Sequence, residues 1–171
     1  VVNWKGENES LASHDNVGNY FSESGLTKNT SITFQQLIQK TSIYTSVSRM
    51  DDNSMIPGAK LVRTNLMAKA VSKFGEGDRW SLDTKIQYTN AKANNRTIGG
   101  PNGSNPFYLL NLMPRSLDVT QFRNSVDANG NMIWYGTGSG INPYWGYQYN
   151  LNEDERDRIM MNGSLKYEIA S

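Results

Sequence analysis

The sequence predicts an all-β protein of about five antiparallel strands that run up and down. Two observations carry this prediction. Apolar and polar side chains alternate with a period of two over several stretches, as they do in a strand with one face against an apolar phase. The composition, with 20 Asn, 15 Gly, 9 Tyr and 4 Trp in 171 residues, is typical of strands joined by turns and loops.

The alternation is clearest over Arg79–Thr89, where no residue breaks the period of two. Four further strands are predicted over Leu26–Gln36, Thr41–Met50, Leu61–Phe74 and Arg156–Ile169. The gaps Leu37–Lys40 and Gly75–Asp78 are short, whereas Asp51–Lys60 and Asn90–Glu155 are long. In an up-and-down sheet the short and the long connections then lie at opposite ends, which is typical of outer-membrane β-barrels.

Short helices are expected in the polar segments, because capping residues and proline precede them. The predicted helices are Asn16–Phe21 after Asp15, Phe107–Met113 after Asn105-Pro106, Leu117–Asn124, and Tyr144–Asn150 after Asn142-Pro143. The stretch Asp127–Gly130 predicts a hairpin turn before a short strand, Met132–Tyr135. Because Asn90–Glu155 is too long for a structureless loop in a compact fold, we expect it to be an ordered insertion.

Charge and composition argue against several functions. Seventeen Lys and Arg against 16 Asp and Glu leave a net charge of +1, so no basic surface for nucleic acid is predicted. With no cysteine and with His14 as the single histidine, the sequence offers neither a thiolate nor a multi-histidine metal site. The acidic cluster Glu153–Asp157 is a local run rather than two carboxylates across a cleft, and Asp51-Asp52-Asn53 lacks the spacing of a calcium loop. We therefore expect no enzyme activity and no cofactor.

The two faces of the predicted strands differ in chemistry. One face carries Trp80, Leu82, Ile86, Tyr88, Ile159, Leu165 and Tyr167. The other carries Asp83, Lys85, Gln87, Asn162, Ser164 and Lys166. This pattern suits membrane strands with lipid on one side and water on the other. It equally suits a half-buried sheet in a soluble protein, so a soluble secreted glycan-binding β module is the alternative function.

Several short motifs occur in an order that resembles a known family. They are Asp15-Asn16-Val17 with Tyr20-Phe21, Met55-Ile56-Pro57 before Leu61–Asn65, Asn105-Pro106, Met113-Pro114-Arg115, Asp127–Gly130, Asn142–Trp145, and Asn152–Arg158 before Gly163–Glu168. Over nearly the whole chain their order and spacing resemble the barrel portion of the SusC/RagA-type TonB-dependent outer-membrane transporters. The stretch Leu37-Ile38-Gln39 departs from the glycine-rich turn of that family.

The resemblance implies that residues 1–171 are an internal fragment of the barrel domain of a larger transporter, an open sheet of about five strands when isolated. Residues 90–155 would be a long, partly helical extracellular loop within it. The family's function is energised import of glycans or peptides across the outer membrane of Gram-negative bacteria. The implied partners are outer-membrane lipid, a SusD-like lid lipoprotein, the substrate, and the TonB energy-coupling complex, which acts through parts outside this chain.

Eight aromatic residues of the long loop are the candidate binding residues, because aromatic faces suit sugar rings and partner interfaces. Among them we single out Trp134, Tyr135, Tyr144 and Trp145 as candidates for contact with substrate or lid. The competing interpretation is that these side chains form a small core of the loop itself.

Overall fold

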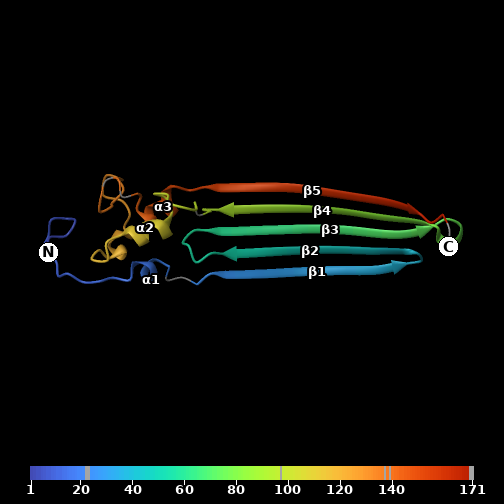
Figure 1. Cartoon of the computed structure of the whole chain (residues 1–171), viewed down its shortest axis with the longest axis horizontal. Coiled ribbons are helices and arrows are strands. Elements are labelled where there is room, and N and C mark those ends of the chain that lie inside the picture. The colour runs from blue at the N-terminus through green and yellow to red at the C-terminus, as the bar shows by residue number, and fades with distance from the viewer. Residues whose placement is uncertain (22–23, 97, 137, 139, 170–171) are drawn as a thin grey trace. The chain divides into compact units, whose positions relative to one another are not determined.

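The computed structural model describes residues 1–21, 24–96, 98–136, 138 and 140–169. It contains one open, antiparallel sheet of five strands in the order β1-β2-β3-β4-β5 (Figure 1). This confirms the predicted all-β, up-and-down fold. The chain divides into two compact units, which we call the sheet unit (27–52, 61–93 and 154–171) and the loop unit (1–26, 53–60 and 94–153).

The strands of the sheet are longer than the alternation alone predicts. They are β1 Leu26–Ile38, β2 Thr41–Asn53, β3 Lys60–Phe74, β4 Trp80–Asn94 and β5 Glu153–Tyr167. The predicted bounds of both long connections are therefore wrong: Asn90–Glu155 shortens to 95–152, and Asp51–Lys60 shortens to the six residues 54–59. The amide of Asn90 donates to Glu155 and Asp157, at 2.9 Å to each, which holds β4 and β5 together past the end of the apolar pattern.

Two tight turns close the hairpins at one end of the sheet. Gln39 adopts a φ of +52° in the β1–β2 turn, a left-handed conformation that a glycine-rich turn would adopt without strain. The β3–β4 turn contains a short 3₁₀ turn, η1 Glu76–Asp78, with Gly75 and Gly77 at φ of +83° and +66°. Lys40 of the first turn donates to Asp78 of the second at 2.5 Å.

Side-chain contacts between strands establish which residues share a face. Pairs on the first face are Thr27 with Asp52, Asn65 with Ser48, Thr89 with Asn65, and Lys69 with Asp83. Pairs on the second face are Thr41 with Ser72, Trp80 with Tyr167, and Tyr88 with Asp157. Because side chains alternate along each strand, these pairs define both faces completely. The predicted face partition of β4 and β5 is confirmed.

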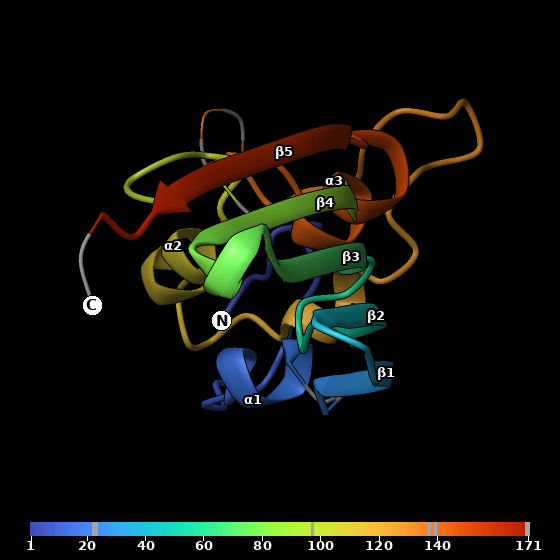
Figure 2. The ribbon, with the colours of Figure 1, turned by 90° about the vertical axis from the view of Figure 1, so that its right-hand side faces the viewer.

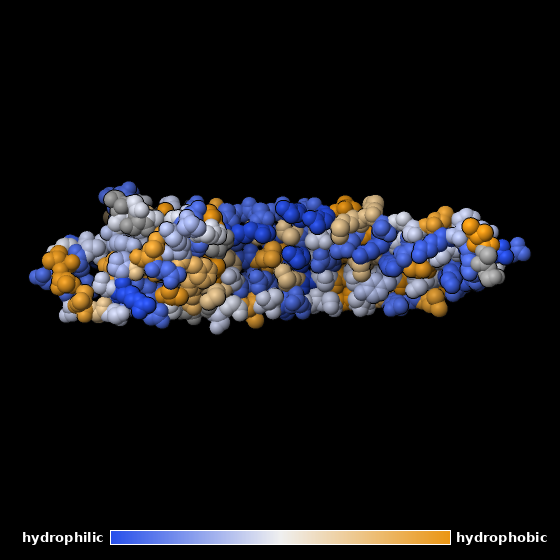
Figure 3. All heavy atoms as spheres, in the orientation of Figure 1, coloured by the Kyte–Doolittle hydropathy of each residue, from blue (hydrophilic) through white to orange (hydrophobic). Residues whose placement is uncertain are grey.

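The sheet unit has almost no interior. Among its described residues only Ala93 is buried, and every residue of β1 is exposed. The row of strands curves when viewed along its length (Figure 2), and both hydrophilic and apolar side chains reach the surface over the strands (Figure 3). Exposed apolar side chains of this size are costly in water, at about 25 cal/mol for each Å². The sheet unit therefore leaves most of its apolar side chains without burial inside the unit.

The loop unit, by contrast, has a core of its own. Its helices are α1 Asn16–Tyr20, α2 Pro106–Leu112, η2 Val119–Phe122 and α3 Pro143–Tyr149. The predicted caps Asp15, Asn105 and Asn142 all accept a backbone N–H with their side chains. The core consists of Tyr20, Phe21, Leu110, Met113, Val119, Phe122 and Tyr144.

Two buried asparagine side chains tie this core together. Asn16 donates to the carbonyl of Leu117 and accepts from the amide of Val119, both at 2.9 Å. Asn142 is fully buried and donates to the carbonyls of Phe122 and Ile133 at 2.9 and 3.0 Å. Their hydrogen bonds satisfy polar groups that the short helices leave open in the interior.

Two local predictions in the loop unit are corrected. The helix predicted over Leu117–Asn124 is a 3₁₀ turn of only four residues. Its first amides donate to side chains, that of Thr120 to Asp118 and that of Val119 to Asn16. The strand predicted over Met132–Tyr135 reduces to a single antiparallel bridge between Val126 and Met132. Asp127 accounts for this, since its carboxylate accepts the amides of Asn129 and Asn131 within the turn. No described helix is long and apolar enough to cross a membrane.

Replacement of Asn142 by alanine should destabilise the loop unit by about 2–4 kcal/mol, because it removes an N-cap and leaves two buried carbonyls without donors. Hydrogen exchange of the amides of residues 119–147 would measure this change. Asn129→Ala is the matched control, since the exposed side chain of Asn129 makes no hydrogen bond to the described part of the chain and its removal should change little. Equal protection in both variants would contradict the role assigned to Asn142.

Candidate functional site

The second face of the sheet is apolar and carries no charge over most of its length; we call it the apolar face. It is free of Lys, Arg, Asp and Glu over residues 30–38, 41–47, 62–74, 80–90 and 159–167 of the five strands. Charged residues of this face begin only beyond those stretches, at Lys28, Arg49 and Asp157. The absence of charge is therefore a continuous band across all five strands.

Aromatic rings gather on the apolar face at the end with the tight turns. Trp80 lies between Phe74 and Tyr167, with ring centroids 6.2 and 4.6 Å away. Gly75 permits this arrangement, because a Cβ at that position would lie 2.8 Å from the Trp80 ring. Trp80 and Tyr167 therefore lie at the same end of the band, and Phe74 joins them. In the sequence, the position of Phe74 directly before the turn indicates that its ring lies at this end of the strand.

The first face is hydrophilic, and we call it the polar face. Opposite the charge-free stretches it carries the cations Arg63, Lys69, Lys73, Lys85 and Lys166, and Arg158 lies directly before the stretch of β5. In the same stretches Asp83 is the only anion, and it pairs with Lys69 at 3.1 Å. The remaining positions are mostly Ser, Thr, Asn and Gln. Such a face is stable only in contact with water or a polar ligand.

Three of the four candidate aromatic residues of the loop belong to its core. Tyr144 is 5% exposed and is part of the core itself. Trp134 and Tyr135 are partly buried against it, with ring centroids 4.8 and 6.1 Å from that of Phe122. Their packing role is therefore visible in the structure.

Trp145 differs from the other three candidates because it is not packed against the core. It stacks instead on Tyr149, with centroids 5.8 Å apart, and Tyr149 is 55% exposed. Tyr149 is one of the eight loop aromatics but is not among the four residues singled out from the sequence. It lies four residues after Trp145 within a predicted helix, and this spacing indicates that the two side chains share a helix face.

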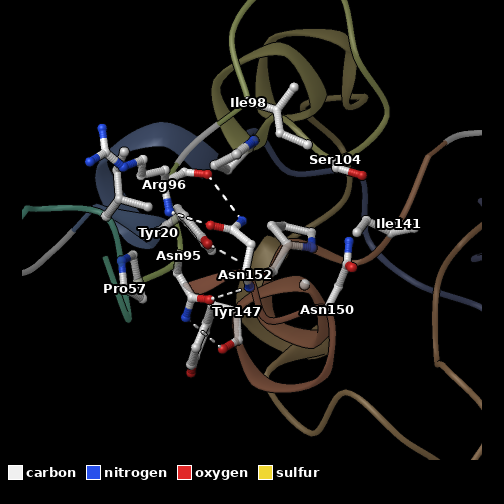
Figure 4. A pocket seen from close by; sticks show the side chains of 14 residues that line it. Tyr20, Pro57, Asn95, Arg96, Ile98, Ser104, Ile141, Tyr147, Asn150 and Asn152 are labelled. Carbon is white, nitrogen blue, oxygen red and sulfur yellow. Dashed lines mark hydrogen bonds between the residues drawn. The ribbon is translucent and has the colours of Figure 1, made fainter. Parts of the chain in front are cut away.

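A small pocket lies within the loop unit where the long connection begins and ends (Figure 4). The backbone amide of Asn95 donates to the carbonyl of Asn152 at 2.7 Å, and the amide of Arg96 donates to the side chain of Asn152 at 2.9 Å. Asn95 also donates to the carbonyl of Tyr147 at 3.3 Å. With a volume of about 60 Å³ the pocket has room only for a few water molecules, so these contacts close the connection rather than form a substrate site.

Burial and hydrogen bonds shift the pKa values of two side chains in the loop unit. Burial raises the pKa of the Tyr20 hydroxyl well above its usual value, and the neighbouring Tyr144 and Tyr147 raise it further. The same hydroxyl donates to the carbonyl of Pro143 at 3.2 Å. The pKa of Asp127 is lowered, because the backbone and side chain of Asn131 donate to its carboxylate.

No group in the described residues has the arrangement of a metal site, in which three or more His, Asp or Glu side chains converge. The acidic run Glu153–Asp157 lies in β5 rather than in a loop base, with Glu155 and Asp157 held by donors from β4. Asp51 and Asp52 point to opposite faces of β2, where Asp51 accepts from Arg49 and Asp52 from Thr27. His14 lies 3.9 Å from Asp118 and is partly exposed.

Comparison with known proteins gives no assignment. No model of a known protein family matches this chain, and no curated protein matches it. The function is therefore argued from the two faces of the sheet and from the loop unit.

Truncation of the loop aromatics should separate packing from surface roles. Trp134→Ala should cost the loop unit about 3 kcal/mol of stability, because it removes a large side chain from the aromatic core. Trp145→Ala should cost less than about 1 kcal/mol, because its ring packs chiefly on exposed Tyr149. Hydrogen exchange of the Phe122 amide would report both changes, and equal losses would contradict this division.

The raised pKa of Tyr20 predicts a pH-dependent loss of stability. A group whose pKa is higher in the folded state stabilises fully below its unfolded pKa and less as pH rises toward its folded pKa. Unfolding free energy of the loop unit should therefore fall above about pH 10. Tyr20→Phe should remove most of this fall, as measured by denaturant titration at pH 8 to 11. An unchanged slope in this variant would rule out Tyr20 as its source.

Proposed function

We propose that the chain forms part of the wall of an outer-membrane β-barrel transporter, of the TonB-dependent type that imports glycans or peptides. The observation that carries this proposal is the charge-free apolar face, which lies opposite a hydrophilic face over the same strand lengths. In water the apolar side chains of this face would be exposed to solvent, which is unfavourable. In a bilayer they would face lipid, while the polar face would line a wet lumen.

The length of the apolar band supports this proposal. From Trp80 to Asn90 the strand advances ten residues, which at about 3.4 Å each gives about 34 Å. At the tilt of about 40° found in such barrels, this length spans about 26 Å, close to their apolar band of about 25 Å. The ring cluster of Phe74, Trp80 and Tyr167 would then lie at a membrane interface, where aromatic girdles occur.

The connections and the sheet edges support the same interpretation. Short turns, residues 39–40 and 75–79, join β1 to β2 and β3 to β4 at one end, whereas the long connection 95–152 and the shorter connection 54–59 lie at the other end. Short periplasmic turns and long extracellular loops are the rule in outer-membrane barrels. Strands β1 and β5 each have one unpaired edge, and in the proposed barrel further strands would pair with both.

The choice of a transporter over a simple pore rests on the loop unit and on the motif order described above. The loop unit is ordered by an aromatic core and buried asparagines. An ordered extracellular loop suits recognition of a specific ligand better than it suits a simple open pore. In this proposal Trp145 and Tyr149 are the loop residues placed to meet substrate or a lid lipoprotein. Energy would come from a TonB complex, and the chain itself would catalyse no reaction.

Opposite-face substitutions at neighbouring positions test this proposal. Ile86→Arg places a charge in the middle of the apolar band and should destabilise the assembled barrel by about 2–4 kcal/mol. Gln87→Arg, the matched control, places the same side chain on the polar face and should be tolerated. The measurement is the folded, heat-modifiable fraction of the full-length protein in outer-membrane preparations.

Equal folded fractions for the two variants would contradict the assignment of lipid and lumen faces. Recovery of the unmodified protein in the aqueous fraction would support a soluble glycan-binding module instead.

A further inference from the structure

A hollow of about 610 Å³ lies over strands β4 and β5, in the sheet unit. Lys85 and Gln87 of β4 border it together with Met160 and Asn162 of β5, and these four side chains belong to the polar face. Ile159 and Met161, which alternate with them on β5 and belong to the apolar face, also border it. The volume is large enough for an oligosaccharide segment, unlike the pocket in the loop unit. On the polar face the lining combines one cation, two amides and one apolar side chain.

The charge around the hollow favours an anionic ligand. Lys85 has no carboxylate within 4.0 Å among the described residues, whereas Lys69 is neutralised by Asp83. Lys166 and Arg158 lie on the same face of the adjacent strand and are likewise without a described ion-pair partner. Several separated cations on one hydrophilic face attract an anionic ligand, and each forms a weak electrostatic contact with it.

We propose that this hollow binds an acidic oligosaccharide, and the proposal rests on the transporter function, in which the polar face lines the lumen. The ammonium group of Lys85 pairs with a sugar carboxylate or sulfate, which is a charge-assisted contact. Gln87 and Asn162 each offer a carbonyl and an amide for ring hydroxyls, and Met160 offers an apolar contact for the C–H face of a sugar ring.

The wall is better suited to an acidic glycan than to an acidic peptide. Its uncharged positions are chiefly hydroxyl and amide side chains, such as Ser81, Thr89 and Ser164, which match the hydroxyl groups of a sugar chain. A peptide ligand would want apolar pockets for its side chains, or a free strand edge for its backbone. On the polar face the hollow offers Met160 as its one apolar side chain, and it lies over the paired edges of β4 and β5 rather than over a free strand edge.

Tetragalacturonate tests this proposal, with its methyl-esterified form as the neutral probe of the same backbone. Binding is measured by calorimetry on the full-length protein extracted in detergent micelles. Tetragalacturonate should bind at least about tenfold more tightly than the ester, and Lys85→Gln should remove about tenfold of its affinity. Lys28→Gln removes the same charge from the apolar face of β1 and should leave the affinity unchanged.

Equal affinity for the acid and its ester would overturn the proposal, as would equal losses in the Lys85 and Lys28 variants. Tetraglutamate that binds more tightly than tetragalacturonate, and depends on Lys85, would overturn it in favour of a peptide ligand. Membrane fractionation separates the two proposals: a protein that assembles in the outer membrane without binding tetragalacturonate would overturn only the ligand. Binding that depends on Lys85 in a protein found in the aqueous fraction would support the ligand site and overturn the transporter.

Discussion

The burial of apolar side chains, which the sheet unit lacks inside itself, is the constraint on which the rest of this structure depends. Apolar burial is the dominant favourable contribution to folding, and the sheet unit has almost none of it internally, since Ala93 alone is buried there. The hydrogen bonds between strands do not replace it, because their net contribution is small. In the barrel that we propose, the charge-free band and the ring cluster around Trp80 would match the dimensions of a bilayer.

The loop unit, unlike the sheet unit, buries apolar side chains inside itself. It buries seven apolar and aromatic side chains around Phe122 and satisfies the interior polar groups with buried asparagine amides. Its helices are only one or two turns long and could not persist alone, so capping and packing are needed together. In this unit Tyr149 is exposed, and the half-buried Trp145 stacks on it.

The charges of the sheet follow from the same division. Over the lengths where the apolar face has no charge, the strands carry five cations on the polar face. With a single aspartate to balance them, that wall is basic although the whole chain is nearly neutral. Net charge therefore hid the property that matters for a ligand, because the two faces and the loop contribute with different signs.

Much of this structure could be predicted from the sequence alone. The period of two determined the strands and the partition of Leu82 and Lys85 to opposite faces, because strand geometry allows only two directions. Asn105-Pro106 and Asn142-Pro143 determined two helix starts through local capping. The ends of β4 and β5 and the burial of Trp134 and Tyr144 were decided only in the tertiary structure. Both depend on contacts between residues far apart in the chain, Asn90 with Glu155 in the first case and the core around Phe122 in the second, and no local pattern encodes them.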